Sequence, residues 1–212
     1  MIVAIDGPAG VGKSTVAKAL AAALGLRVLD TGAMYRAVTW KALAEGVDVG
    51  DGGACGSLAE GIQLGFGAEG IVIDGVGRES EIRSVEVDRA VSIVAAHSAV
   101  RAAIVPMQRE IAVDGAVAEG RDTTTVVFPQ AEHRFFLAAS AEERSRRRAA
   151  QRGGEESLQS ILAEIERRDR LDSTRADSPL RRGEGVRVVE TDGLDAAGVV
   201  AEMLAVIRAA GS

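Results

Sequence analysis

Residues 7–14 have the types and spacing of a loop that binds phosphate groups. They read Gly-Pro-Ala-Gly-Val-Gly-Lys-Ser and fit the pattern G-x-x-x-x-G-K-[ST]. Glycines permit backbone angles at which several N–H groups point at one anion. Lys13 can reach the β- and γ-phosphates of a nucleoside triphosphate, and the Ser14 hydroxyl can bind Mg²⁺. The predicted binding residues for the triphosphate are Gly7, Pro8, Ala9, Gly10, Val11, Gly12, Lys13, Ser14 and Thr15.

The context of this loop separates it from a glycine-rich turn that binds nothing. An apolar run precedes it at residues 2–5, and a helical pattern of apolar residues follows at 13–24. A strand before the loop and a helix after it are the setting that this motif requires, because the start of the helix adds its positive dipole end. We therefore favour the phosphate-binding interpretation.

Two further clusters of reactive side chains each follow a predicted strand. In residues 30–36, Thr31 can hydrogen-bond a base edge and Arg36 can bind an anion, although a helix N-cap with a solvated arginine would look the same. In residues 119–122, Asp122 can hold a Mg²⁺-bound water or accept a hydrogen bond from an exocyclic amine such as cytosine N4. The alternative for Arg121 and Asp122 is a local ion pair in a turn.

A third cluster, residues 167–175, lies on a predicted helix. Arg168 and Asp172 are four residues apart and Arg168 and Arg175 are seven apart, so the three side chains share a helix face. That face could present two cations and a carboxylate to a nucleotide. A solvated charged helix fits the spacing equally well, and spacing alone favours it.

The elements that must position these residues alternate along the chain, which predicts an α/β fold with a five-stranded parallel sheet and helices on both faces. Ligands bind such sheets beyond the carboxyl ends of the strands. The predicted strands are residues 2–5, 27–29, 116–118, 134–137 and 187–189. The predicted helices are residues 13–24, 33–44, 98–112, 140–152, 157–170 and 196–209.

Two segments interrupt this alternation. Residues 47–90 are rich in glycine and contain two short predicted strands, 62–66 and 71–73, so we expect an insertion in a core made of 1–46 and 91–212. Residues 150–158 form a polar stretch in which Gly153-Gly154 could be the hinge of a lid. An ordinary connection between two helices is the alternative for the second segment.

Composition restricts the class of protein further. The chain has 212 residues, enough for one globular domain, and its net charge of −6 argues against a general nucleic-acid-binding surface. Cys55 is its single cysteine, which excludes an internal disulfide and a cysteine metal cage. No apolar run approaches the roughly 18 residues of a membrane-spanning helix. We expect a cytoplasmic monomer whose partners are small-molecule nucleotides, with no membrane or nucleic-acid partner.

Taken together, the motifs resemble the bacterial cytidylate kinases, the (d)CMP kinase branch of the nucleoside monophosphate kinases, nearly from end to end. The resemblance implies a P-loop kinase fold with a monophosphate-binding insertion and a short lid. It also implies phosphorylation of CMP and dCMP by ATP with Mg²⁺, within pyrimidine nucleotide metabolism. It rests on the sequences at residues 5–14, 30–36, 81–83, 100–101, 120–122, 125–129, 141–144 and 168–180.

The resemblance implies a role for each matching residue. The cytosine ring would contact Thr31, Arg101 and Asp122, and the sugar would contact Ser92, Arg168 and Asp172. The acceptor phosphate and the transferring group would be held by Arg36, Arg121 and Arg175. ATP would be contacted by Arg144 and Arg148, beside Arg152. The catalytic residues would be Lys13, Arg36, Arg121 and Arg175, with Ser14 on the metal.

The chain departs from the family pattern in three places. Thr124 stands where the family usually has glycine, and we expect its side chain to crowd the loop. The last strand continues as Val189-Glu190-Thr191-Asp192, where the family usually has an Asp-Thr pair, and the insertion is unusually rich in glycine.

Three other functions remain open at this point. The chain could be a kinase for another acceptor, such as UMP, AMP or a small hydroxyl compound. It could be a nucleotide-dependent switch, although it lacks the Asn/Thr-Lys-x-Asp guanine motif of a GTPase. It could be a weakened regulatory nucleotide binder, against which the intact Lys13 and Ser14 argue.

Overall fold

The computed structural model describes residues 1–151, 153 and 156–210. The chain forms two compact units, the second of which is Asp30–Val113 with Arg175–Asp177. The first contains Met1–Leu29, Asp114–Thr174 and the described residues from Ser178 onward. The predicted insertion, residues 47–90, lies within the second unit. The predicted hinge at Gly153-Gly154 includes Gly154, which lies outside the described residues.

The first unit is built on a parallel sheet of five strands in the order β2-β6-β1-β7-β8. The predicted α/β class and all five core strands are confirmed. In the register of the sheet, Ile5 lies opposite Glu119 and Asp6 opposite Gly120, so the ends of β1 and β6 are adjacent. The strands are β1 (Ile2–Asp6), β2 (Arg27–Asp30), β6 (Ala116–Gly120), β7 (His133–Ala138) and β8 (Arg187–Glu190).

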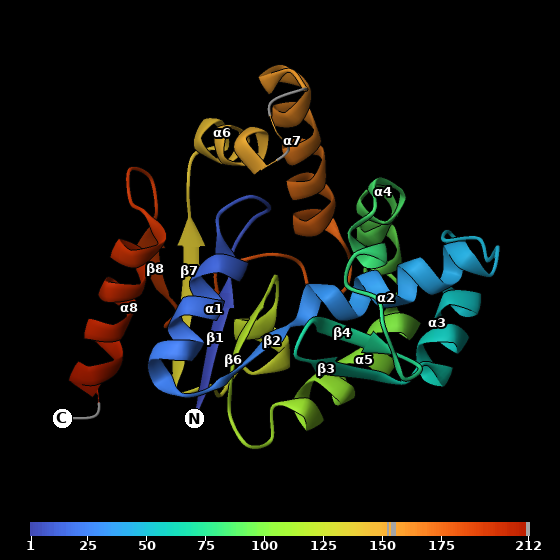
Figure 1. Cartoon of the computed structure of the whole chain (residues 1–212), viewed down its shortest axis with the longest axis horizontal. Helices are drawn as coiled ribbons and strands as arrows, with labels where there is room; N and C mark the ends of the chain where they lie inside the picture. The colour runs from blue at the N-terminus through green and yellow to red at the C-terminus, as the bar shows by residue number, and fades with distance from the viewer. Residues whose placement is uncertain (152, 154–155, 211–212) are drawn as a thin grey trace. The chain divides into compact units, whose positions relative to one another are not determined.

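The helices of this unit follow the alternation that the sequence predicts. They are α1 (Lys13–Leu24), α6 (Ala141–Gln151), α7 (Leu158–Thr174) and α8 (Ala196–Ala210), and their arrangement around the strands is seen in Figure 1. α1 ends at Gly25, whose φ of 67° is accessible to glycine at little cost. α6 begins where the Ser140 hydroxyl accepts from the Glu143 N–H at 3.2 Å, while the Ser140 N–H donates to Asp192.

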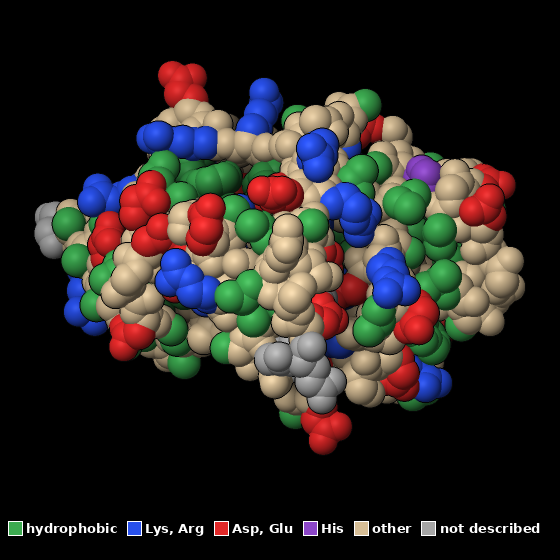
Figure 2. Space-filling view, turned by 90° about the horizontal axis from the view of Figure 1, so that it is seen from above, with side chains coloured by type: hydrophobic (Ala, Val, Ile, Leu, Met, Phe, Trp, Pro, Cys, Tyr) green, Lys and Arg blue, Asp and Glu red, His purple; other side chains and the backbone are tan. Residues whose placement is uncertain are grey.

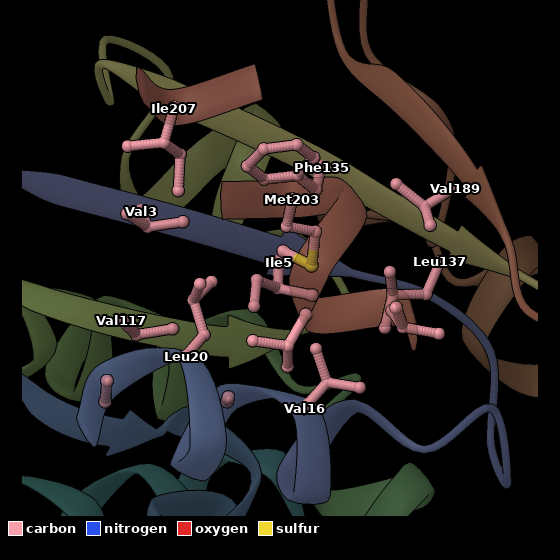
Figure 3. Packing of buried hydrophobic residues seen from close by; sticks show 14 of the residues in the cluster. Val3, Ile5, Val16, Leu20, Val117, Phe135, Leu137, Val189, Met203 and Ile207 are labelled. Carbon is pink, nitrogen blue, oxygen red and sulfur yellow. The ribbon is translucent and has the colours of Figure 1, made fainter. Parts of the chain in front are cut away.

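One face of the sheet carries the core of the unit. Ile5 and Phe135 are almost fully buried and point toward Leu20 of α1 and Met203 of α8, so both helices pack on this face (Figure 3). Burial of each such side chain stabilises the fold by about 1.5–3 kcal/mol. Because side chains alternate along a strand, Asp6 points to the opposite face. Packing of β1 therefore fixes both the phosphate loop that follows it and the carboxylate of Asp6.

The second unit packs four α-helices with an antiparallel sheet of order β3-β4-β5. Its helices are α2 (Thr31–Ala44), α3 (Gly52–Gly61), α4 (Val85–Val94) and α5 (Ser98–Ile111), with a 3₁₀ turn η1 (Glu81–Arg83). Its strands are β3 (Leu64–Gly67), β4 (Gly70–Ile73) and β5 (Val76–Gly77). The two short strands of the insertion are thus confirmed, whereas α3, α4 and β5 were not predicted.

α3 forms in the glycine-rich insertion, where we predicted two short strands and no helix. The Asp51 carboxylate caps it by accepting from the N–H groups of Gly53 and Ala54. A Cβ at Gly56 would lie 2.5 Å from the Ala99 Cβ of α5, so glycine permits the two helices to approach closely. Tertiary packing therefore outweighs the low helix propensity of glycine.

Among the described residues, no single helix has the length and hydropathy needed to cross a membrane. α4 and α5 satisfy that criterion only when taken together, and they are bent by 100° at their junction.

Candidate active site

The predicted phosphate loop links the end of β1 to the start of α1. A Cβ at Gly7 would lie 2.5 Å from the Leu137 carbonyl oxygen, so only glycine permits this approach to the neighbouring strand. Gly12 has a φ of 95° and is the N-cap of α1. Because glycine has no side chain to accept from the first helical N–H groups, these groups and the helix dipole remain for a bound anion.

Lys13 is buried at the base of this loop, with 6% of its surface exposed. Its Nζ donates to the carbonyl oxygens of Gly7 and Pro8, both at 2.9 Å. Burial and, after it, the charge of Arg121 lower the pKa of Lys13, and the charge of Glu119 opposes them; the net result is a pKa of about 7. The ammonium group therefore lacks a strong counterion here, and a triphosphate would supply one.

Ser14, at the start of α1, contacts Glu119, near the carboxyl end of β6. The Ser14 hydroxyl donates to Glu119 Oε1, and Glu119 is the buried penultimate residue of β6. Among the described residues, no group of three or more His, Cys, Asp or Glu side chains could hold a metal ion. A cation at Ser14 and Glu119 would thus need phosphate oxygens and water as further ligands, which is the usual environment of Mg²⁺.

Asp6 is held by four donors on the η2 segment (Thr123–Val127), a π-helical turn. The backbone N–H groups of Thr123 and Thr124 donate to its two oxygens, each at 2.8 Å. Their hydroxyls donate at 2.7 and 2.6 Å. Thr124 is fully buried. The expected crowding by Thr124 is therefore wrong: its side chain has room and satisfies a buried carboxylate.

Replacing Thr124 with valine removes one of these four bonds without changing the size of the side chain. We expect the free energy of unfolding to fall by about 1–3 kcal/mol, because a buried charged acceptor loses a donor. Urea denaturation measures this change. Thr39→Val is the matched control, because the buried Thr39 hydroxyl donates only to the Tyr35 carbonyl within its own helix, at 2.8 Å. Equal losses in the two variants would contradict a special role for the Asp6 contact.

Arg121 and Asp172, which the sequence analysis assigned to phosphate and sugar, are paired with each other. Arg121 Nε donates to Asp172 Oδ2 at 2.9 Å. Burial by itself lowers the pKa of Arg121, but the Asp172 carboxylate outweighs that effect and raises the pKa. The guanidinium thus remains charged, and three of its five N–H groups are not engaged by Asp172 or by the Gly120 carbonyl. Asp122, the residue after Arg121 in the chain, is also buried. Arg168 lies on α7, one turn before Asp172.

Two arginines of α6 contact the backbone of the phosphate loop. Arg144 donates to the Ala9 carbonyl at 3.0 Å and to Asp169 of α7 at 2.6 Å. Asp169 in turn accepts from the Ala9 N–H at 3.3 Å. Arg147 donates to the Val11 carbonyl at 3.2 Å and to the Thr191 hydroxyl at 2.9 Å. Arg148, which we predicted with Arg144 as an ATP contact, is half-buried on the same helix.

The second unit contains the remaining predicted residues. Arg36, on α2, is buried and donates to the Ile82 carbonyl at 3.3 Å and to Asp88 of α4. Arg101 donates to the Ala95 carbonyl at 3.1 Å, and its guanidinium lies 5.2 Å from the ring centre of Tyr35. Thr31 and Ser92 are buried, and Arg175 is half-buried in the short segment Arg175–Asp177.

Several residues that contact predicted site residues were not selected from the sequence. Arg36, Arg121 and Arg144 each pair with a carboxylate, and the sequence analysis had singled out only one of these carboxylates, Asp172, as a site residue. Basic and acidic side chains are also interspersed over the face shown in Figure 2. These unassigned residues are Asp88, Glu119, Arg147 and Asp169.

The family model described as cytidylate kinase matches residues 3–209. A cytidylate kinase of Mycobacterium leprae is 44% identical over 213 residues, which cover 98% of this chain and 96% of that protein. A bifunctional pantoate ligase/cytidylate kinase of Prochlorococcus marinus is 45% identical, and the match covers 98% of this chain but 43% of that protein. A gluconokinase structure from Sinorhizobium meliloti has a TM-score of 0.50 at 16% identity, covering 99% of this chain and 93% of that one, which bears on the fold alone.

Proposed function

This chain belongs to the cytidylate kinase family, and on that premise we propose how its residues transfer the γ-phosphate of ATP to CMP. It is a kinase that phosphorylates CMP with ATP. The observation that carries the proposed mechanism is the phosphate loop with the buried Lys13 and the Ser14–Glu119 contact. We propose that dCMP is also an acceptor.

In the proposed reaction, an oxygen of the CMP phosphate attacks the γ-phosphorus of ATP in line. The bond between the γ-phosphorus and the β,γ-bridging oxygen breaks, and ADP leaves. The attacking phosphate oxygen is already anionic, so the reaction needs no strong general base. Lys13 and the arginines supply positive charge where the transferred group is most negative, and catalysis consists of positioning and charge stabilisation.

Ser14 and Glu119 suit Mg²⁺ because both offer oxygen ligands. We propose that Ser14 binds the ion through its hydroxyl and that Glu119 orients that hydroxyl or a metal-bound water. When bound there, the ion would supply positive charge that neutralises the phosphate groups of ATP. In the free enzyme the hydrogen bond between Ser14 and Glu119 holds both ligands in place.

For the acceptor, we propose the residue roles that the family resemblance implies. Thr31, Arg101 and Asp122 read the base, because the cytosine amino group donates to a carboxylate while N3 and O2 accept from arginine or a hydroxyl. Ser92, Arg168 and Asp172 contact the sugar. Arg36, Arg121 and Arg175 hold the phosphates, and the buried Arg36 and the largely buried Arg121 give strong charge-assisted bonds.

Acceptor dependence of ADP release tests this function. With ATP and Mg²⁺, we expect ADP to form rapidly with CMP or dCMP, more slowly with UMP or AMP, and scarcely at all with no acceptor. The base-reading residues discriminate by hydrogen bonds, and unpaired polar groups in a wrong complex are costly. ADP release that is equal with and without an acceptor would contradict the proposal and indicate a simple NTPase.

A further inference from the structure

Arg36 is already neutralised by another residue of the protein. Its guanidinium is buried, with 7% of the residue exposed, and it donates to the Ile82 carbonyl and to the carboxylate of Asp88. Asp88 lies in the first turn of α4, whose N-terminus is capped by the Ser84 hydroxyl. α2 and α4 therefore bring an arginine and an aspartate together in a mostly desolvated pair.

A second anion at Arg36 must compete with this carboxylate. A phosphate monoester carries between one and two negative charges near neutral pH. If it binds Arg36 while Asp88 remains in place, two anions share one buried cation, and their repulsion is weakly screened at such a site. If Asp88 moves away, its ion pair with Arg36 is lost. Either way, the affinity for the phosphate group is lower than a free guanidinium would give.

The geometry also indicates that Asp88 is not needed to orient Arg36. The Ile82 carbonyl fixes one amino group of the guanidinium, and burial limits the movement of the rest. An asparagine in place of Asp88 has the same shape and still offers a carbonyl oxygen to Arg36. Loss of the negative charge alone should therefore favour binding of a phosphate.

We propose that Asp88 is a specificity-determining residue that competes with the phosphate of the acceptor for Arg36. This proposal rests on the proposed role of Arg36 as a phosphate ligand. In consequence, a ligand that offers only a phosphate gains less affinity at Arg36 than it would at an unpaired guanidinium, whereas CMP offsets the exchange through contacts to its base and sugar. Inorganic phosphate should thus be a poor competitor of CMP.

The test compares CMP with cytidine, which lacks the phosphate, by calorimetric titration of the full chain. In Asp88→Asn we expect CMP to bind about tenfold more tightly and cytidine to bind as before. Inorganic phosphate should compete with CMP more strongly in this variant. Asp88→Ser should change CMP binding in the same direction, and it supplies a second folded variant if the first is unstable. Asp74→Asn is the matched control, because Asp74 pairs with Lys41 in the same unit at 2.8 Å and should not affect CMP.

Two outcomes separate this inference from the proposed function. If Arg36→Ala binds CMP as tightly as the unaltered protein does, Arg36 is not a phosphate ligand and the assignment on which the inference rests is wrong. If Arg36→Ala weakens CMP but Asp88→Asn leaves it unchanged or weaker, Asp88 supports Arg36 and the inference alone is overturned. In the double variant Arg36→Ala/Asp88→Asn, the tightening should disappear.

Discussion

Replacing Lys13 with alanine is expected to lower kcat by about two to three orders of magnitude with CMP as acceptor. The ammonium group is buried against the phosphate loop, where its charge would stabilise the transferring group in a weakly screened environment. The loss should be similar for every acceptor that the enzyme accepts, because Lys13 acts on the donor. Steady-state rates at saturating ATP and CMP measure it.

Lys18→Ala is the control for this change, since Lys18 lies exposed on the same helix. It should retain normal turnover. Near-normal turnover in Lys13→Ala would contradict the mechanism, provided that circular dichroism shows the same helix content. The affinity for CMP should change little in either variant, which places the effect on the transfer step.

Replacing Arg36 with alanine is expected to reduce kcat/KM for CMP by about 30- to 1000-fold, the usual range for a buried charged partner. The KM for ATP should change much less, because Arg36 is assigned to the acceptor. The same change removes Arg36 from the partly buried Asp88 carboxylate, so the fold is destabilised as well. Rates should therefore be measured well below the thermal midpoint of the variant.

Arg78→Ala is the matched control for this second prediction. Arg78 belongs to the same unit, lies over the Trp40 ring at 5.1 Å and pairs with Glu81, but it has no assigned role in CMP binding. Its loss should leave kcat/KM for CMP within about twofold, as expected for an exposed pair. If the two variants behaved alike, the effect of Arg36→Ala would be one of stability and not of binding.

The sequence predicts the elements whose pattern is local. The five core strands lie at the predicted places, and each contains buried apolar residues, most of all β1 and β6. α3 was missed because its four glycines lower helix propensity, and its stability depends on Ala99 of α5, some forty residues away. α4 did have a signal, since Val87, Ala90, Val91 and Val94 repeat with helical spacing. We had instead included the first half of α4 in the glycine-rich insertion.

In the candidate site too, residues that are adjacent in the sequence could be predicted, whereas contacts between residues distant in the sequence could not. The phosphate loop is contiguous, so its residues could be predicted together. The carboxylates that pair with arginines could not, because Asp169 meets Arg144 from 25 residues away and Asp88 meets Arg36 from 52. Glu119 was within reach of sequence reasoning, since it directly precedes the Gly-Arg-Asp cluster at a strand end. Its partner Ser14 is 105 residues away and is identified only by the pairing of β1 with β6.

The pairing of Arg36, Arg121 and Arg144 with carboxylates also affects how nucleotides reach the enzyme. Paired charges form short-range dipoles whose fields cancel within a few ångströms, and the chain as a whole carries a charge of −6. Anionic ATP and CMP therefore meet no long-range electrostatic attraction on approach. Because like charges repel, the rate of encounter should not exceed that of unguided diffusion and should rise with ionic strength. Selectivity is then exerted after contact, when each arginine exchanges an internal partner for a phosphate.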